Sequence, residues 1–189
     1  MDSIKAKLTG ISTMLMHSSR LSNPLDSKVK ELKLRTGKKK KTDEDQWAIA
    51  RAEFELGMYY DDKLGPYIPT ENIRKSIIEG GRLSKLGTAI DRCVQVLEDR
   101  AKLEYKGPRT VAELWEGKFY DLSSVGVQNA RTMRCRPAFE KWSATIELFF
   151  DPSMINRDQL LASMEAAGKF VGLGDYRPRY GRYSVEVVK

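Results

Sequence analysis

The 189-residue chain has little of what metal sites, membrane spans and secretion signals require. It contains one histidine, His17, and two cysteines, Cys93 and Cys135, that lie far apart in the sequence. These residues leave no plausible zinc site, and we expect neither a metal nor any other cofactor. No apolar run approaches the roughly 18 residues that span a bilayer, and residues 1–10 hold no apolar signal core. We therefore expect a cytoplasmic protein with reduced cysteines and no membrane partner.

Positive charge, by contrast, is in excess. The chain has 33 Lys and Arg residues against 26 Asp and Glu residues, a net charge of +7, and 41% of its residues are hydrophobic. This length and apolar fraction suffice for a core, in one domain with a large insertion or in two small domains. The charge favours an anionic partner, in the order nucleic acid, acidic protein and membrane surface.

Residues 168–189, GKFVGLGDYRPRYGRYSVEVVK, combine glycines with basic and aromatic residues. The glycines are Gly168, Gly172, Gly174 and Gly181, the arginines are Arg177, Arg179 and Arg182, and the tyrosines are Tyr176, Tyr180 and Tyr183. Glycine permits positive φ angles, so this loop can present backbone N–H groups to a phosphate. Arginines add fixed positive charge, and tyrosine rings offer faces on which bases stack. Two interpretations fit: a nucleic-acid contact, or a tight connection with solvated charges.

Two further segments are basic. The first is the lysine run Lys38, Lys39, Lys40 and Lys41. It is either a solvated loop tip or an electrostatic finger that lies along a phosphate backbone. The second holds Arg131, Arg134 and Arg136, of which the last two share one side if the segment is a strand. Such a row is either a platform for nucleic acid or a solvated strand face.

Residues 3–16 alternate and then become apolar, which predicts a first, partly buried strand that ends at residues 17–20. His17 lies at this end and could act as a general acid or base. Because the chain has no second histidine, we favour a hydrogen-bonded histidine at a strand end. His17 and Arg20 are also candidate nucleic-acid contacts.

Caps and apolar periodicity predict five helices. They are a short helix after the cap Asp26, a helix from Thr42 or Asp43 to about Gly57, a helix over 71–82 capped by Thr70, a short helix over 110–115, and a helix over 157–167 between the cap Asn156 and Gly168. Gly80 and Gly81 suit a helix interior poorly, so the third helix ends there or packs closely against another element. Trp47, Ala50 and Phe54, at helical spacing, are expected to pack against other elements rather than to form a ligand box.

Strands are predicted between these helices. Residues 93–105 form one bent strand or a hairpin, residues 121–137 a hairpin that turns near Gln128 and Asn129, residues 142–150 the clearest strand, and the chain ends in a strand. Without the insertion after the first strand, the order is strand, helix, strand, strand, helix, strand. This order predicts an α+β fold, a ferredoxin-like or RRM-like βαββαβ antiparallel sheet with two helices. We expect one domain over 1–189, with insertions at 18–66 (a basic thumb loop and a helix) and 106–141 (the hairpin).

The start of the helix over 71–82 is a further candidate contact. Residues 65–69 are extended and rigid, and a helix N-terminus beside such a segment can bind a phosphate through its N–H groups. Arg74 and Lys75 add positive charge, whereas Glu71 in the first turn opposes an anion there.

Two segments of the chain resemble motifs of the RAMP superfamily (repeat-associated mysterious proteins), in particular the backbone subunits of CRISPR effector complexes. The family opens its first helix with a motif like yIPGSSLKGxLR and ends a glycine-rich loop with GxGR. Here Tyr67-Ile68-Pro69 matches, residues 70–72 replace Gly-Ser-Ser, Arg74 or Lys75 stands at the lysine, Arg82 matches loosely, and Gly172-Leu173-Gly174 and Arg179-Tyr180-Gly181-Arg182 match the loop.

The resemblance implies protomers that stack into a helical filament along single-stranded RNA, with residues 21–41 as a thumb between bases. It also implies, in effector complexes, further subunits as partners. Stand-alone relatives look to be carried by phages and mobile elements, and the small size of this chain is compatible with them. In type III relatives an aspartate before Asn-Pro cuts target RNA, whereas Ser22 precedes Asn23-Pro24 here. Serine lacks the required carboxylate, so the resemblance implies a non-catalytic chain, although Asp26 is close by.

Three functional hypotheses follow. The first is a non-catalytic protein that binds a single-stranded nucleic acid, RNA in preference to DNA, and self-associates along it. The second is a RAMP-type endoribonuclease that uses His17 or Asp26, although such enzymes usually carry two of these domains. The third is a structural assembly protein whose basic surface offsets an acidic partner. The first hypothesis takes as its contacts His17, Arg20, Lys38, Lys39, Lys40, Lys41, Arg74, Lys75, Arg131, Arg134, Arg136, Arg177, Arg179 and Arg182.

Overall fold

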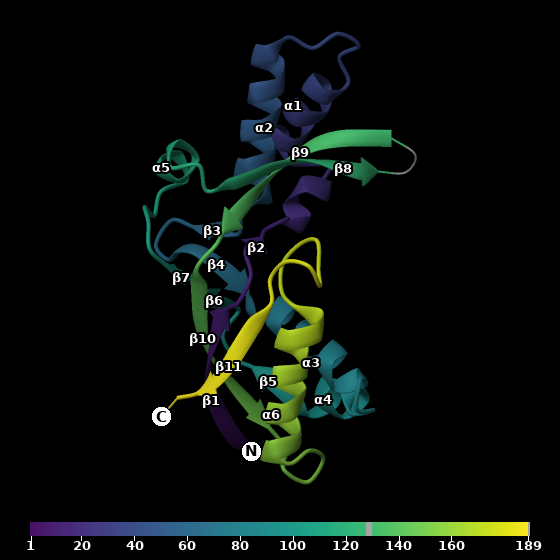
Figure 1. Ribbon diagram of the computed structural model, residues 1–189, viewed down its shortest axis with the longest axis vertical. Helices are drawn as coiled ribbons and strands as arrows, with labels where there is room; N and C mark the ends of the chain where they lie inside the picture. Colours follow the sequence, from purple (N-terminus) through teal and green to yellow (C-terminus); the bar gives the residue numbers. More distant parts are fainter. Residues whose placement is uncertain (128–129, 189) are drawn as a thin grey trace. The chain divides into compact units, whose positions relative to one another are not determined.

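The computed structural model describes residues 1–127 and 130–188 and divides the chain into two compact units. Unit 1 consists of residues 1–14, 60–106 and 140–189, and unit 2 consists of residues 15–59 and 107–139. Both combine helices with antiparallel strands, so the fold class is α+β, as the sequence predicts (Figure 1). None of the helices in the described ranges has the length and apolar character needed to cross a membrane.

Unit 1 is organised around an antiparallel sheet whose strands come from both ends and the middle of the chain. Its order is β11 (Tyr183–Val187), β1 (Asp2–Gly10), β10 (Trp142–Phe150) and β5 (Val94–Val96), and β7 (Glu104–Tyr105) pairs with the start of β10. Buried and more exposed residues alternate along β1 and β10. Because alternate side chains point to opposite faces, one face of this sheet is apolar and the other is polar.

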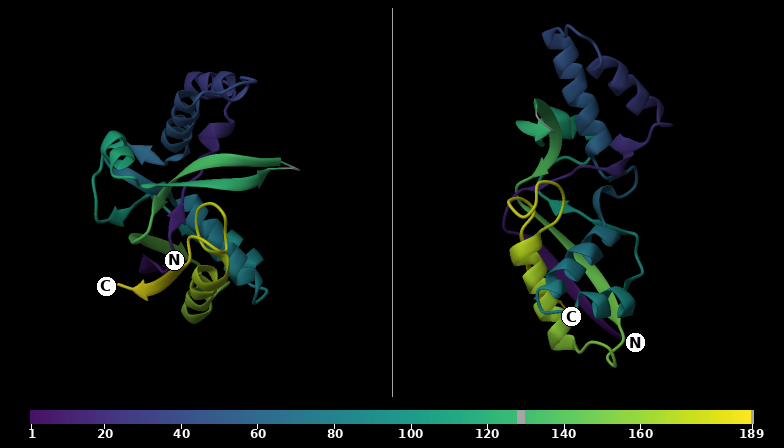
Figure 2. Two further views of the ribbon diagram at one scale, coloured as in Figure 1. Left: turned by 45° about the horizontal axis from the view of Figure 1, so that its top comes forward. Right: turned by 90° about the vertical axis from the view of Figure 1, so that its right-hand side faces the viewer.

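Two helices, α3 (Thr70–Arg82) and α6 (Arg157–Ala166), cover the apolar face of this sheet (Figure 2). Burial of an aliphatic side chain contributes about 1.5–3 kcal/mol, so this layer is the main source of stability in unit 1. The side chains that meet there are almost fully buried: Ile4, Ala6, Leu8, Ile73, Ile77, Leu148, Phe150, Leu160 and Met164.

The helices approach each other most closely at Gly80. A Cβ added to Gly80 would lie 2.5 Å from both the carbonyl oxygen of Ser163 and the backbone nitrogen of Ala167. The sequence left two possibilities for Gly80 and Gly81, a helix end or a close contact. The second is confirmed, because α3 continues to Arg82.

The prediction for residues 93–105 is wrong, because these residues form neither one bent strand nor a hairpin. Cys93 ends a helix, α4 (Gly87–Cys93), and the chain then gives β5 to the main sheet. The next strand, β6 (Arg100–Lys102), joins a second antiparallel sheet of order β3 (Tyr60–Asp61), β4 (Gly65–Pro69), β6. The chain leaves the first sheet because the backbone N–H of Thr70 and its hydroxyl bind the carbonyls of Asp99 and Glu98, which holds the bend against the start of α3.

Two further predictions about element boundaries are wrong. Thr70 is the first residue of α3 rather than its cap, because its hydroxyl donates to the Glu98 carbonyl instead of accepting from the helix. The single strand expected over 3–16 is two strands, β1 and β2 (Met14–Leu15). β1 ends at Gly10, where a Cβ would collide with the Trp142 ring.

Gly168 does not stop the last helix. Asn156 forms the expected capping box, but the helical path continues beyond α6 as a π-helical turn, η2 (Ala167–Val171), and ends at Gly172. An added Cβ at Gly168 would meet the carbonyl oxygen of Tyr183. Glycine is therefore required at this position for a close approach to β11 rather than for a helix end.

Unit 2 contains a helix pair. α1 (Ser27–Thr36) is capped by Asp26, whose carboxylate accepts from the Lys28 backbone N–H at 2.9 Å, and α2 (Asp43–Gly57) begins with a capping box between Thr42 and Asp45. These caps confirm the predicted helix starts. The two helices share a buried apolar cluster: Val29, Leu32, Ile49 and Leu56.

The second half of unit 2 is a hairpin and a short helix. β8 (Tyr120–Val127) and β9 (Ala130–Phe139) pair antiparallel, as the sequence predicts, and the chain enters the unit through β2, which lies beside β9. The predicted turn at Gln128 and Asn129 lies outside the described residues. Thr110 caps α5 (Val111–Glu116), which precedes β8. The 3-10 helix η1 (Ser19–Ser22) connects β2 to α1.

Candidate nucleic-acid interface

The glycine-rich loop of unit 1, residues 172–182, is held in one conformation by its own backbone. Gly172, Gly174 and Gly181 all have positive φ angles, 78°, 78° and 72°. The Leu173 N–H donates to the Gly181 carbonyl at 2.9 Å, and the Gly181 N–H donates to the Thr13 carbonyl at 2.8 Å. Only glycine adopts such angles without strain, so these positions fix the base of the loop and leave residues 175–180 as its tip.

The tip presents arginines and stacked tyrosines. Arg177 and Arg179 are exposed, and within the part of the chain that the structure describes neither forms an ion pair. The rings of Tyr176 and Tyr180 stack with centroids 5.6 Å apart, and the Arg179 guanidinium lies 5.9 Å from the Tyr180 centroid. Arg182 is exposed, and its Nε donates to the Pro178 carbonyl at 2.8 Å. This tip therefore carries positive charge beside aromatic rings.

Tyr183 does not contribute a stacking face, which corrects the sequence interpretation. It is buried, and its hydroxyl shares a hydrogen bond of 3.2 Å with Ser76 Oγ. Burial raises the pKa of Tyr183 to about 12. Its role in the described structure is to anchor β11 against α3.

The basic residues of α3 are tied to acidic neighbours. Arg74 Nε lies 2.8 Å from Glu71 and its Nη1 lies 2.9 Å from Asp91, while Lys75 lies 3.7 Å from Glu71. The guanidinium of Arg74 lowers the pKa of Glu71, which thus remains ionised in the first helical turn. A carboxylate at this place competes with any phosphate. The start of α3 is therefore a weaker anion site than its two basic residues alone suggest.

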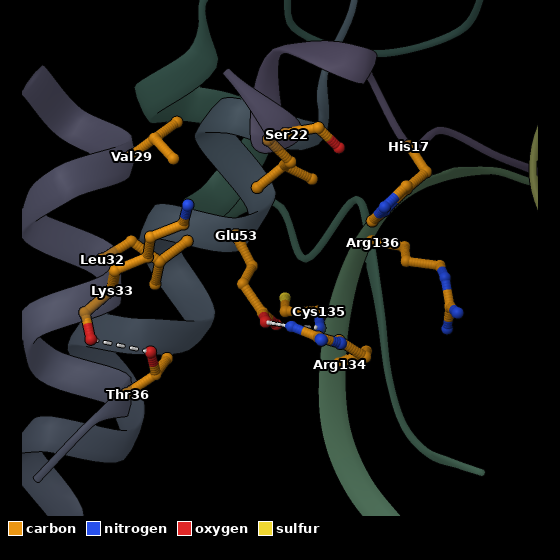
Figure 3. Close-up of a pocket in the computed structure, with 11 residues that line it drawn as sticks. His17, Ser22, Val29, Leu32, Lys33, Thr36, Glu53, Arg134, Cys135 and Arg136 are labelled. Carbon is orange, nitrogen blue, oxygen red and sulfur yellow. Dashed lines mark hydrogen bonds and ion pairs between the residues drawn. The ribbon is translucent and has the colours of Figure 1, made fainter. Parts of the chain in front are cut away.

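Three of the predicted residues meet in unit 2. His17, Arg134 and Arg136 line a cavity of about 290 Å³, together with apolar side chains of α1 such as Val29 and Leu32 (Figure 3). Arg134 and Arg136 alternate with a buried residue along β9, so they share one side of the strand, as predicted. The cavity has Arg134 and Arg136 of β9 on one wall, and the opposite wall, from α1, mixes the apolar Val29 and Leu32 with Lys33 and Thr36 (Figure 3).

Glu53 of α2 is the buried acidic residue among those that line this cavity. It is only 4% exposed, and its carboxylate accepts from Arg134 Nη1 and from the backbone N–H of Cys135 at 2.9 Å. Burial, Glu53 and Asp121 together raise the pKa of Cys135 to about 12, so its thiol stays protonated and is a poor nucleophile. Arg134 is therefore positioned by a buried ion pair, and the cavity holds no activated thiol.

Asp26 binds backbone N–H groups and Arg20 and is not among the residues that line the cavity. Its carboxylate caps α1 and accepts from Arg20 Nε at 2.7 Å. The Arg20 hydrogen bond lowers the pKa of Asp26. Arg20 is thus partly neutralised, and Asp26 has a structural partner at both of its oxygens.

The lysine run lies at the start of α2. Lys38 Nζ is 2.7 Å from Asp45 Oδ1, which lowers the pKa of Asp45, and Lys41 Nζ donates to the Lys38 carbonyl at 2.9 Å. Lys39 and Lys40 are exposed, and the described residues give them no ion-pair partner. Arg131 of β9 is exposed as well.

Sequence reasoning missed Glu53. A signal was present, because Glu53 follows Ile49 and Ala50 at helical spacing and so lies on the buried side of α2. Of the three residues expected to pack, Ala50 and Phe54 are buried, whereas Trp47 contacts Trp115 but remains 54% exposed. Spacing shows which side of a helix a residue occupies, but not how far a neighbouring element covers it.

Neither a protein-family model nor a curated protein matches this chain. Within residues 1–127 and 130–188, no group of three or more His, Cys, Asp or Glu side chains could hold a metal ion. The site is therefore described by its own chemistry, which is cationic and aromatic.

Proposed function

We propose that this protein binds a single-stranded nucleic acid, RNA in preference to DNA, without cutting it, and that copies of the chain stack along the strand. The observation that carries this proposal is the tip of the glycine-rich loop, where exposed Arg177 and Arg179 stand beside the stacked Tyr176 and Tyr180. Guanidinium groups bind phosphates, and aromatic rings stack on bases of any sequence.

The sheet of unit 1 supports a ferredoxin-like fold, which is part of this proposal. Its four main strands follow the order β11, β1, β10, β5, and α3 and α6 lie between the first and second and between the third and fourth strands along the chain. RNA-recognition domains use a four-stranded sheet of this family. On this basis we also propose a relationship to the RAMP superfamily, with residues 172–182 as its glycine-rich loop.

The polar face of the sheet is a weaker candidate than the loop. Lys5 is opposite Glu147 across β1 and β10, and Lys7 is opposite Glu186 across β1 and β11. Opposite charges at paired positions leave this face with little net attraction for a phosphate backbone. The ligand is therefore expected to contact the loop rather than lie across the sheet.

The geometry of unit 2 supports a role without catalysis. Ser22 stands where cleaving relatives are expected to have an aspartate, and Asp26 is committed to the cap of α1 and to Arg20. Cys135 is buried and protonated. These groups supply neither an activated nucleophile nor a free carboxylate for attack on a nucleic-acid strand.

The experiment compares two variants that remove equal charge. Arg177→Ala with Arg179→Ala should lower the affinity for a single-stranded oligonucleotide by about tenfold, because two phosphate contacts and their counterion release are lost. Lys63→Ala with Lys141→Ala removes two exposed lysines of the same unit and should change the affinity by less than about twofold. Equal effects of the two variants would show that the loop is not the site.

The cavity that His17 shares with Arg134 and Arg136 favours one second candidate, an endoribonuclease. Incubation of a labelled strand with the protein separates the two functions. An intact strand supports binding, whereas products that disappear in a His17→Ala variant support cleavage. If no strand binds even at low salt, the remaining candidate is an assembly protein with an acidic partner.

A further inference from the structure

Unit 2 contains an aromatic cluster that extends from the core to the surface. Trp115 of α5 lies at its centre: its ring centroid is 4.7 Å from Tyr120 in a stacked arrangement, 5.4 Å from Phe54 and 6.5 Å from Trp47. Phe54 is fully buried, Trp115 and Tyr120 are half-buried, and Trp47 is 54% exposed. The inner rings account for the packing of α2 against α5.

Trp47 is not needed to complete that packing. Its contact with Trp115 is T-shaped, with an angle of 85° between the rings, and more than half of its surface remains in water. Exposed apolar surface costs about 25 cal/mol for each Å², and tryptophan is enriched, and leucine under-represented, among the residues that carry most of the binding energy at interfaces.

Basic residues precede and follow Trp47 along the chain. Lys38 is paired with Asp45, so the lysine run is held at the first turn of α2, just before Trp47. One helical turn beyond Trp47, the guanidinium of Arg51 lies 5.9 Å from the Trp115 centroid. Lys39 and Lys40 remain exposed.

Acidic residues occupy the same region and limit the attraction. Asp45 is used by Lys38 and by the capping box, and Glu55 lies 3.1 Å from Arg51, but Asp43 and Glu44 stand in the first turn of α2 without an ion pair among the described residues. A purely electrostatic ligand would therefore gain little here. A ligand that carries a flat aromatic group gains from the exposed ring itself, and the lysine run adds long-range attraction for its phosphates.

We propose that Trp47, with Trp115 behind it and Lys39 and Lys40 in the segment that precedes α2, is a second contact for the single-stranded nucleic acid, in which an unpaired base stacks on Trp47. This inference rests on the proposed function. It adds a contact in unit 2 that does not involve the glycine-rich loop of unit 1. A duplex buries its base faces, so the contact selects unpaired bases.

Tryptophan fluorescence gives the test, using the full-length protein. The chain has three tryptophans, and Trp142 is buried in unit 1, where its Nε1 donates to the Ser12 carbonyl. A saturating single-stranded oligonucleotide should quench the wild-type emission through the exposed ring. In Trp47→Phe most of this quenching should disappear, whereas it should remain in Leu34→Ala, which changes an exposed apolar residue of α1.

Affinity gives the second readout. Trp47→Ala should weaken binding of the oligonucleotide by about tenfold, and Leu34→Ala should leave it unchanged. Circular dichroism of both variants checks that α2 is still folded, and Trp47→Leu, which keeps an apolar side chain, should weaken binding as Trp47→Ala does.

Three results would overturn the inference. Quenching that persists in Trp47→Phe, or an affinity that is unchanged in Trp47→Ala while Arg177→Ala with Arg179→Ala lowers it, would leave the proposed function intact and remove this contact. Loss of self-association in Trp47→Ala at unchanged affinity would make the ring a contact between copies of the chain. Failure of the wild-type protein to bind any strand would instead refute the proposed function itself.

Discussion

The two units differ in how they carry positive charge. Unit 2 has fifteen Lys and Arg residues against ten Asp and Glu residues, an excess of five, whereas unit 1 has eighteen against sixteen, an excess of two. Both units pair some of their cations, as Arg74 does with Glu71 and Asp91 in unit 1 and Arg134 does with Glu53 in unit 2. Unit 1 exposes Arg177 and Arg179 at the tip of one loop, where neither forms an ion pair with a described residue. Unit 2 spreads its excess over the lysine run and the hairpin.

Under the proposed function, this difference divides the roles of the two units. Unit 1 has the larger sheet and the layer of helices, and its loop is fixed by backbone hydrogen bonds to residues far apart in the sequence. A fixed loop can place a few arginines accurately, which favours specific geometry. Unit 2 supplies more charge on mobile lysine side chains, which favours long-range, salt-dependent attraction.

The largest expected effect concerns the buried ion pair of unit 2. Glu53→Gln places an amide where a carboxylate accepts from Arg134 and from the Cys135 N–H, and should lower the free energy of unfolding of this unit by about 3 kcal/mol. Hydrogen exchange of α2 and β9 amides, read by mass spectrometry, measures this change in the free energy of unfolding. Glu55→Gln on the same helix removes only surface pairs and should cost less than about 1 kcal/mol. Equal costs would mean that Glu53 does not hold unit 2 together.

Gly80→Ala should destabilise unit 1 by about 2 kcal/mol, because the new methyl group meets the backbone of η2 and α6 at 2.5 Å. Exchange of α3 and α6 amides reports the change. The matched control is Gly126→Ala in β8, where an added Cβ meets nothing within 4 Å and stability should stay nearly constant. A neutral Gly80→Ala would show that the two helices are not in close contact.

Alkaline pH should weaken unit 1 through Tyr183. Its pKa is raised from 10.0 to about 12 by burial, so its contribution is fully present below pH 10 and is lost as the pH rises through 12. At pH 11 the loss is on the order of 1 kcal/mol. Urea unfolding from pH 9 to 12 should show this dependence in the wild-type protein and a weaker one in Tyr183→Phe. Identical slopes would mean that Tyr183 is not buried.

The smallest effects test whether the units unfold separately. Thr42→Ala in unit 2 and Asn156→Ala in unit 1 each remove a capping box and should cost about 1 kcal/mol. If the units are independent, each variant accelerates amide exchange in its own unit alone. Acceleration in both units by either variant would show one cooperative structure and weaken the comparison.

The sequence predicted those parts of the fold that local chemistry determines. Side-chain caps such as Asp26, Thr42 and Asn156 identify helix starts because each satisfies backbone donors within a few residues. The alternation of apolar and more polar residues over β10 is an equally local signal, because it depends on the strand's own sequence. Residues 93–105 were not predictable in this way, because their strands join different sheets and the partners lie far along the chain.

The candidate site was also predicted only in part, because local signals do not reveal tertiary contacts. Residue type and spacing identified Arg177 and Arg179 and the pair Arg134 and Arg136, which the structure finds on one loop tip and on one side of β9. Residue type did not reveal which cations are already paired, as Arg74 is, nor that Tyr183 is buried. Those outcomes depend on tertiary contacts, which a single sequence does not display.

The most direct test of the account is a salt titration of strand binding that also examines the strand afterwards. A labelled single-stranded RNA is titrated with the wild-type protein at about 50 and 200 mM salt, and the strand is recovered and sized. We predict binding that weakens by about tenfold or more between these concentrations and a strand that remains intact. Absence of binding at the lower concentration, or a shortened strand, would contradict the claim that this protein holds a nucleic acid without cutting it.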